Sequence, residues 1–305
     1  MKKIIFIGSK ELGLKVLMKI YNLTPERLIA CITLNDGSDT RSKLLEFRNF
    51  CKTQQIPIHV LEGKCDITEI IHLYTPDICF VVGWYYLIPK QVIEFVPHGF
   101  IGIHNSLLPK YRGHAPLVWS MLNGEEIIGY SVFSFTKEMD KGNLWHQESI
   151  RINQNDYIND VLLKVEKSVL QFFDQKYLAL INDQLQPYPQ SEKNVSYGAK
   201  RVETDGYINW NQDNKKIYNF IRAQARPYPG AFSYYKKQKI IIWKARIFPD
   251  TFYGSPGQIG FINKDTDEIT VICGDNSAII LEEIQIEDKI VKPNDIIKSL
   301  NNRFY

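Results

Sequence analysis

Short apolar runs alternate with longer amphipathic stretches through the first half of the chain. The apolar runs cover residues 3–8, 28–34, 57–60, 77–83 and 99–104. The stretches between them, at 10–22, 41–54, 67–74 and 89–95, have the periodicity of helices. Strands that are apolar throughout and separated by helices are typical of a parallel sheet covered on both faces. The pattern therefore predicts an α/β fold with a Rossmann-like, mainly parallel sheet and helices on both faces.

Two further strands, at 128–136 and 144–152, precede a long helix at 156–182. The apolar side chains of this helix form one stripe, made by Ile158, Leu162, Val165, Val169 and Phe172. Because they recur at the period of a helix, we expect the helix to pack along that stripe.

The pattern changes after residue 184. Residues 185–206 are polar and rich in turn formers, which predicts a linker. One helical stretch at 214–224 is then followed by short apolar runs at 230–235, 239–248, 257–262, 268–274 and 277–286. Short strands in succession indicate a small, barrel-like β-rich domain. We expect one domain over 1–184, the linker over 185–206, and a C-terminal β-rich domain over 207–305.

Composition narrows the class of protein without choosing a function. The 305 residues are 44% hydrophobic and 23% charged, as in globular proteins with room for two domains. A net charge of +3 is too small to indicate a nucleic-acid partner. The five scattered cysteines include no C-x-x-C pair, which argues against disulfides and a zinc site. No apolar run reaches the roughly 18–20 residues of a membrane span, so we expect a cytoplasmic protein.

Candidate chemistry gathers where predicted strands end, because ligands of open α/β sheets bind outside the carboxyl ends of the strands. Gly8 and Ser9 follow the first strand, and Lys10 begins the next helix. Amides at a helix start can hold an anion, so these three residues are candidate substrate contacts. The alternative is a tight turn alone. The chain lacks both the G-x-G-x-x-G and the G-x-x-x-x-G-K-[ST] motifs.

His104 and Asp140 are the candidate catalytic pair. His104 ends the apolar run FIGI and precedes the loop NSLLPKYRG, while Asp140 lies in the polar cluster EMDKGN. A carboxylate can orient an imidazole and favour its cationic form, which stabilises developing negative charge. The alternatives are a histidine that is only hydrogen-bonded near the core and an aspartate in a solvated turn.

The stretch HNSLLPKYRGHAPLVWSMLNGEEIIGYSVFSFTKEMDKGN resembles the core signature of the folate-dependent formyltransferases. In that family a histidine precedes S-L-L-P-x-Y-R-G, and an aspartate follows in a D-x-G-[DN] loop. GWYYLIPKQVI (83–93), VETDGYINW (202–210) and IRAQARPYPGAFSYY (221–235) are also similar to the family. The resemblance covers nearly the whole chain, and its central motif is specific.

The resemblance implies that a formyl group passes from N10-formyltetrahydrofolate, a co-substrate, to a primary amine, without a metal. It implies that His104 stabilises the oxyanion and relays a proton while Asp140 holds the ring. It also implies a folate site formed by Trp84, Tyr85, Tyr86, Leu87, Ile88 and Asp140. The alternative for the three aromatic residues is packing on the sheet edge.

The loop after His104 supplies further candidates. Ser106 and Arg112 are possible substrate contacts, although Arg112 could equally be a solvated surface charge. The family usually carries asparagine two residues before the histidine, as a second oxyanion donor, whereas this chain has Gly102. We expect Asn105 to fold back into the space that glycine leaves and to act as the donor. A backbone amide, a water molecule or slower catalysis are the alternatives.

Charge helps to choose between the two acceptors found in the family. A tRNA-binding enzyme needs cations against phosphates. The region after the second strand sets Asp36 and Asp39 against Arg41 and Lys43, and residues 201–305 carry 15 Lys and Arg against 13 Asp and Glu. We therefore expect the partner to be a nucleotide-linked amino sugar rather than a nucleic acid. The stretches GWYYLIP and HNSLLPKYRGHAPLVW also resemble the sugar branch of the family, which implies a dTDP-4-amino-4,6-dideoxyhexose.

Three other functions stay open. Methionyl-tRNA formyltransferase is the main alternative. A nicotinamide-dependent oxidoreductase would share the layout of the first half but lacks its glycine motif. A relic disabled by Gly102 could bind nucleotide sugars without catalysis, although it would have no need of both His104 and Asp140. The resemblance further implies a homodimer and a role in O-antigen biosynthesis.

Overall fold

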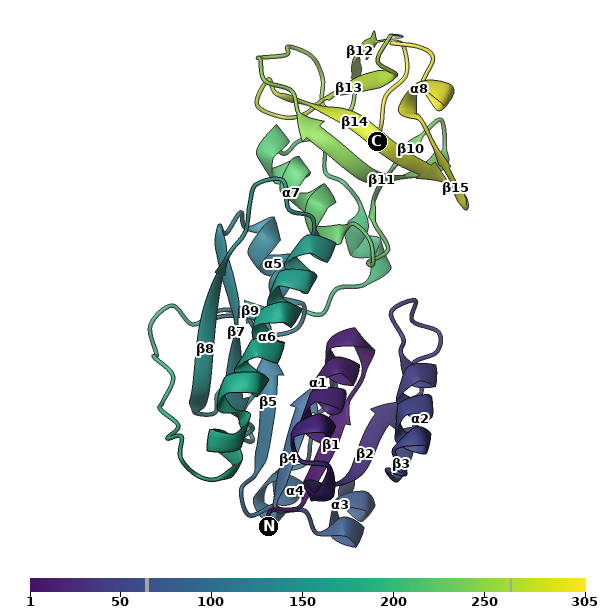
Figure 1. The fold of residues 1–305 in the computed structure, drawn as a ribbon. Helices are drawn as coiled ribbons and strands as arrows, with labels where there is room; N and C mark the ends of the chain where they lie inside the picture. The colour runs from purple at the N-terminus through teal and green to yellow at the C-terminus, as the bar shows by residue number, and fades with distance from the viewer. Residues whose placement is uncertain (64–65, 264) are drawn as a thin grey trace. The chain divides into compact units, whose positions relative to one another are not determined.

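The computed structural model describes residues 1–63, 66–263 and 265–305. These residues form two compact units whose segments alternate along the chain (Figure 1). Unit 1 comprises Met1–Pro116, Ile128–Ile150 and Leu163–Gly198, and unit 2 comprises Leu117–Ile127, Arg151–Leu162 and Ala199–Tyr305.

The described part of unit 1 is built on a seven-stranded sheet with the order β3-β2-β1-β4-β5-β7-β8. The strands are β1 (Ile4–Gly8), β2 (Leu28–Leu34), β3 (Ile58–Leu61), β4 (Ile78–Val82), β5 (Phe100–His104), β7 (Ile127–Ser134) and β8 (Leu144–Arg151). The first five pair in parallel, and β7 runs antiparallel to β5. The predicted mainly parallel sheet is confirmed.

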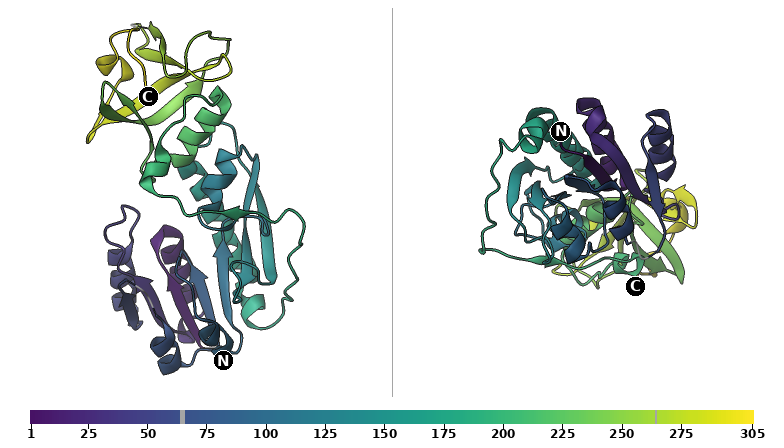
Figure 2. Two further views of the ribbon diagram at one scale, coloured as in Figure 1. Left: turned by 180° about the vertical axis from the view of Figure 1, so that it is seen from behind. Right: turned by 90° about the horizontal axis from the view of Figure 1, so that it is seen from below.

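Helices cover both faces of this sheet (Figures 1 and 2). They are α1 (Lys10–Leu23), α2 (Leu44–Thr53), α3 (Thr68–Tyr74), α4 (Lys90–Phe95) and α6 (Ile158–Ile181). Successive strand residues point to opposite faces. Ile5 of β1 therefore packs in one cluster with Ile71 of α3 and Val92 of α4, whereas the Phe6 ring stacks 6.3 Å from that of Phe47 in α2. Because both of their faces are buried, the central strands β1 and β4 are apolar throughout, whereas the edge strand β8 is polar and partly exposed.

Unit 2 confirms the predicted C-terminal β-rich domain. Its described strands form an antiparallel sheet of β10 (Ala231–Tyr235), β11 (Gln238–Ile247), β14 (Ala278–Ile286), β13 (Glu268–Ile272) and β12 (Ile259–Asn263), with β15 (Lys289–Val291) beside β14. α7 (Asn214–Gln224) packs on the sheet through Ile217 and Ile221, and Asp213 caps it by accepting from the Lys216 amide at 2.9 Å. α8 (Pro293–Ile296) is a single turn.

Several short elements were not predicted from the sequence. α5 (Pro116–Leu122) follows the SLLPKYRG loop, and its apolar residues lie within the stretch that resembles the family signature. β6 (Arg112–Gly113) and β9 (Tyr197–Gly198) form a two-residue parallel ladder, so part of the predicted linker pairs with the motif loop. None of the described helices is at once long enough and apolar enough to cross a membrane.

Candidate active site

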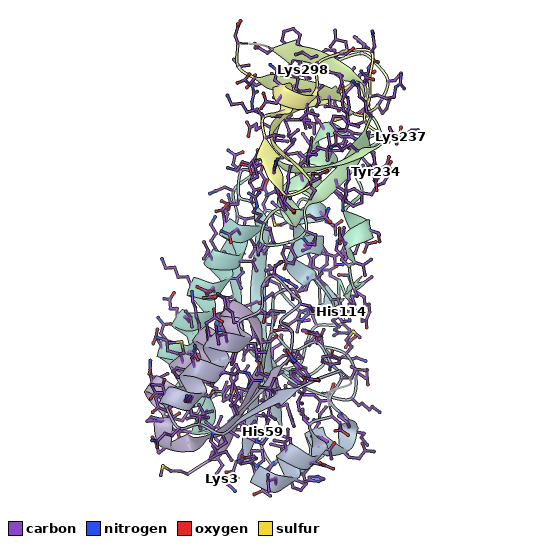
Figure 3. The ribbon with its side chains drawn as sticks, turned by 90° about the vertical axis from the view of Figure 1, so that its right-hand side faces the viewer. Lys3, His59, His114, Tyr234, Lys237 and Lys298 are labelled. Carbon is purple, nitrogen blue, oxygen red and sulfur yellow. The ribbon has the colours of Figure 1, made fainter. Side chains whose placement is uncertain are left out.

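A pocket of about 700 Å³ opens in unit 1 where the central strands end. Its lining comes from the loop after β4, the end of β5, the loop after β6 and the loop after β7. His114, labelled in Figure 3, lies in this lining just after β6. The pocket therefore occupies the edge at which ligands of open α/β sheets bind.

The structure brings His104 and Asp140 together in the lining of this pocket. His104 is the last residue of β5 and is 8% exposed. Its Nδ1 lies 3.6 Å from Oδ2 of Asp140, which is longer than a hydrogen bond. The two groups thus face each other without a direct hydrogen bond, and each keeps capacity to bond a third group.

The orientation of the His104 ring is fixed by a backbone carbonyl. Nε2 lies 2.7 Å from the carbonyl oxygen of Tyr111. A carbonyl oxygen only accepts hydrogen bonds, so Nε2 carries the hydrogen. Nδ1, which faces Asp140, is therefore the nitrogen that can gain and lose a proton.

Asp140 is held by Gly113, the last residue of β6. Its Oδ2 accepts from the Gly113 amide at 2.6 Å. Gly113 has a φ of +96°, and a Cβ there would lie 2.7 Å from the Gly198 carbonyl oxygen. Only glycine fits this position, which places its amide against the carboxylate.

The space beside Gly102 is not available to Asn105. A Cβ on Gly102 would lie 2.2 Å from Cε1 of Phe135, so a phenylalanine ring fills the position expected for a second donor. The expectation that Asn105 folds into this space is therefore wrong. Asn105 nevertheless lines the pocket, and its Oδ1 is buried without a hydrogen-bond partner among the described residues. Its role as an oxyanion donor stays a prediction.

The predicted folate loop, Trp84, Tyr85, Tyr86, Leu87 and Ile88, lies in the pocket lining as a unit. Ile88 and Trp84 pack in the core cluster that contains Ile71 and Val92. Tyr85, in contrast, is 45% exposed. The Tyr85 and Tyr86 rings are 5.0 Å apart. The indole Nε1 of Trp84 is buried without a hydrogen-bond partner among the described residues. The loop thus packs against the core and also lines the pocket, and its role in folate binding stays a prediction.

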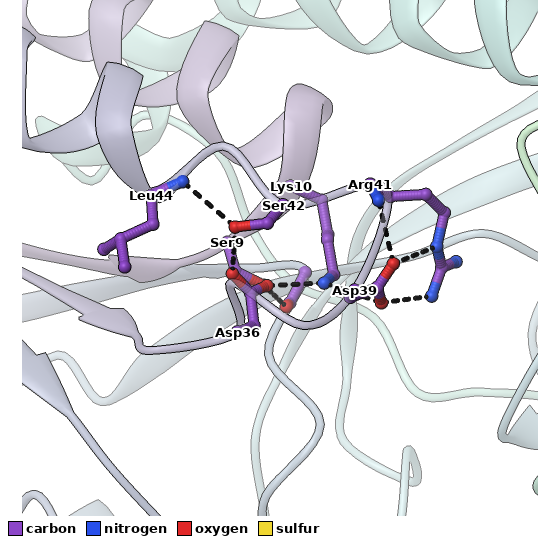
Figure 4. A network of polar contacts seen from close by, with 8 residues as sticks. Ser9, Lys10, Asp36, Asp39, Arg41, Ser42 and Leu44 are labelled. Carbon is purple, nitrogen blue, oxygen red and sulfur yellow. Dashed lines mark hydrogen bonds and ion pairs between the residues drawn. The ribbon is translucent and has the colours of Figure 1, made fainter.

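Lys10 lines the same pocket but is engaged in a charge cluster (Figure 4). Its Nζ pairs with Asp36 and, at 2.8 Å, with Asp39. Asp36 also accepts from the Ser42 hydroxyl, and Asp39 from the Arg41 guanidinium. Burial raises the pKa of Asp39, but the hydrogen bonds from Arg41 and Lys10 outweigh it and leave the pKa well below its usual value.

Four predicted substrate contacts, Gly8, Ser9, Ser106 and Arg112, are not among the described residues that line the pocket. Gly8 is buried at the end of β1. The Ser9 hydroxyl donates to the Gly83 carbonyl at 2.6 Å, and the Ser106 hydroxyl to the Lys110 carbonyl at 2.6 Å. Arg112 is 1% exposed and donates to Gln190, so it is not a surface charge either. The three polar residues thus already have hydrogen-bond partners inside the protein, and a role of these four residues in substrate binding stays a prediction.

Three contributors to the site escaped the sequence analysis. Tyr111 acts through its backbone carbonyl, which carries no signal of residue type. Phe135 looked like an ordinary apolar residue of its loop. Gln190 lay in the polar segment that was interpreted as a linker, yet it bonds to the chain at Asp140.

Comparison with known proteins agrees with this geometry. The formyl transferase family matches residues 25–174, and the formyl transferase C-terminal domain matches residues 201–301. A methionyl-tRNA formyltransferase of Alkaliphilus oremlandii is 30% identical over 297 residues, which cover 94% of this chain and 93% of the relative. The bifunctional polymyxin resistance protein ArnA of Wigglesworthia glossinidia brevipalpis is 29% identical over 296 residues. That match covers 96% of this chain, which spans only 44% of ArnA.

A solved structure shares the fold over nearly its whole length. The N-formyltransferase from Helicobacter canadensis, in complex with folinic acid and dTDP-3-aminofucose, superposes with a TM-score of 0.73 at 21% identity. The match covers 94% of this chain and 100% of that chain. With two domain matches, a relative of nearly equal length and this shared fold, the chain belongs to the folate-dependent formyltransferase family.

Proposed function

We propose that this protein transfers a formyl group from N10-formyltetrahydrofolate to the amine of a nucleotide-linked amino sugar, with His104 and Asp140 as the catalytic pair. The observation that carries the proposal is their arrangement, 3.6 Å apart in the lining of one pocket. Because the separation exceeds a hydrogen bond, a reacting group can bond to either residue without displacing the other.

The chemistry needs one acid–base group. The neutral amine attacks the formyl carbon, and the carbonyl oxygen takes the displaced electron pair. The His104 imidazolium stabilises this oxyanion through Nδ1–H, and the Asp140 carboxylate faces the same nitrogen. The carbonyl then re-forms as the bond from the formyl carbon to N10 breaks, and His104 relays a proton from the former amine to N10. Acid–base help of this kind contributes about 10²–10⁴-fold to the rate.

We propose that the loop after β4 and Asp140 bind the folate. Trp84 offers a buried donor that has no partner among the described residues, and the Tyr85 ring beside it is partly exposed in the same lining. Aromatic rings next to a donor suit a flat ring system whose edge carries hydrogen-bond acceptors.

Two observations support an amino sugar as acceptor. The Helicobacter canadensis protein was crystallised with dTDP-3-aminofucose. In the present chain Lys10 is paired with two carboxylates, so that it offers little net charge to a polyanion. The charge balance of the sequence favours a small nucleotide-linked acceptor over tRNA but does not choose the position of the amine. A dTDP-4-amino-4,6-dideoxyhexose and a dTDP-3-amino sugar are therefore both tested.

Methionyl-tRNA formyltransferase activity is the second candidate, because the relative of that name matches over 93% of its own length. A panel separates the two. The protein is incubated with N10-formyltetrahydrofolate and a dTDP-3-amino sugar, a dTDP-4-amino sugar or initiator methionyl-tRNA, and tetrahydrofolate release and product mass are followed. Product with a sugar alone supports the proposal. Product with tRNA alone favours the second candidate, and no product in any arm contradicts both.

The described pocket residues all lie between Lys10 and Asp140. This supports a catalytic domain within residues 1–184 and a separate β-rich domain over residues 207–305. The compact units differ from these bounds, because unit 1 extends to Gly198 and unit 2 takes in Leu117–Ile127 and Arg151–Leu162. The homodimer that the resemblance implies is checked by light scattering of the purified protein.

A further inference from the structure

The segment predicted to be a linker runs back along the loops that carry the catalytic pair. Residues 188–198, here called the strap, are attached at both ends. At one end Tyr188 exchanges two backbone hydrogen bonds with Leu144, at 2.8 and 2.9 Å. At the other, β9 pairs in parallel with β6, and the Gly198 carbonyl accepts from the His114 amide at 2.9 Å.

Between these ends the Gln190 amide bridges the Asp140 loop and Arg112. Its Nε2 donates to the carbonyl of Asp140 at 2.7 Å and to that of Gly142 at 2.8 Å. Its Oε1 accepts from Nη2 of Arg112 at 2.7 Å and from Nε at 3.2 Å. A flipped amide would set oxygen against two carbonyls and NH₂ against a guanidinium, so only one orientation is bonded.

We propose that Gln190 is a positioning residue for Asp140; the inference rests on the catalytic role proposed above. Asp140 has a φ of +50°, an uncommon conformation for a residue with a side chain. Gln190 holds its carbonyl, while the Gly113 amide holds Oδ2. With the backbone fixed on one side and the carboxylate on the other, the separation from His104 is set. Gln190 is not among the described residues of the pocket lining.

The strap also supports the histidine. The Ser196 hydroxyl accepts from the Tyr111 amide at 2.9 Å, and the Tyr111 carbonyl accepts from Nε2 of His104. One segment thus braces both members of the pair through atoms outside the described pocket lining. A positioning role of this kind predicts a lower rate when the strap is altered, with little change in substrate binding.

The test replaces one amide group. Gln190→Glu keeps the oxygen that faces Arg112 but replaces the NH₂ donor by an oxygen directed at two carbonyls, so it loosens the Asp140 loop selectively. The control is Gln186→Glu, which makes the same charge change at an exposed position just before the strap. Gln190→Met, which removes the hydrogen bonds without adding charge, is measured if the Glu variant does not fold.

We expect Gln190→Glu to lower kcat by about 10–100-fold with KM for folate and acceptor changed by less than about threefold. Gln186→Glu should match the native protein. An unchanged kcat, a rise in KM that matches the fall in kcat, or a loss of activity that follows only the loss of folded protein, would overturn the proposal.

His104→Asn in parallel separates this inference from the proposed function. If His104→Asn retains full turnover, the proposed catalytic pair is wrong. If His104→Asn is inactive while Gln190→Glu behaves like the native protein, only the positioning role fails.

Discussion

Two groups of charged residues at the same pocket are built in opposite ways. In the lysine cluster of Lys10, Asp36, Asp39 and Arg41, each charge has a close partner of opposite sign (Figure 4). In the His104–Asp140 pair the two groups stand 3.6 Å apart.

The partners of the two groups differ as well. Asp36 is 6% exposed and bonds a lysine and a serine, so its lone pairs are satisfied by other side chains. His104 and Asp140 are held instead by backbone groups, the Tyr111 carbonyl and the Gly113 amide. Backbone groups fix a side chain without neutralising it. The pair therefore keeps its charge chemistry for a ligand, whereas the cluster uses its charges to hold the loop after β2.

The largest effect should come from the pair. His104→Asn removes the imidazole that relays the proton, and Asp140→Asn removes the charge beside it. Either change should lower kcat by about 10²–10⁴-fold while the folded protein persists. Steady-state kinetics and thermal unfolding measure the two quantities. The control is His98→Asn, at a partly exposed histidine outside the described lining. An equal loss of kcat in all three variants would show that the His104–Asp140 pair has no special role.

A smaller effect is expected from the cluster, and on a different quantity. Lys10→Met leaves Asp36 buried with only Ser42 as a partner, so the free energy of unfolding should fall by about 1–3 kcal/mol. KM for the acceptor should change by less than about tenfold. Urea unfolding and kinetics are compared with Lys216→Met, which breaks an exposed pair with Asp213 and should cost under about 0.5 kcal/mol. A large rise in KM without loss of stability would show that Lys10 binds substrate after all.

The smallest effect concerns the pH dependence of stability. The pKa of Asp39 is lowered in the folded protein, so its contribution to stability is complete above the unfolded pKa of about 4 and is lost as pH falls towards the folded value. Asp39→Asn should therefore reduce stability at pH 7 by less than about 1 kcal/mol after solvent screening. The difference between variant and native protein should shrink below about pH 4. A difference in stability that grows as the pH falls would contradict a lowered pKa for Asp39 in the folded protein.

The sequence alone determined the order of the longer strands and helices in both units. In unit 1, strands such as IIFIG and ICFVV are buried on both faces, and such runs differ clearly from the amphipathic helices between them. The sequence also singled out His104 and Asp140, because their residue types and their places at strand and loop ends stand out locally. The loop Trp84–Ile88 was found through its resemblance to the family's folate loop, and it does line the pocket.

Only the tertiary structure decided which polar groups have bonding capacity left for a ligand. Ser9, Ser106 and Arg112 looked available in the sequence, but each is bonded to a segment or loop that folds over it. The space beside Gly102 went to Phe135 from another strand end, and the presumed linker supplied Gln190 to the Asp140 loop. Hydrogen bonds and close packing reach only a few ångströms. Whether a group is satisfied therefore depends on which distant segments approach it, and local sequence does not carry that information.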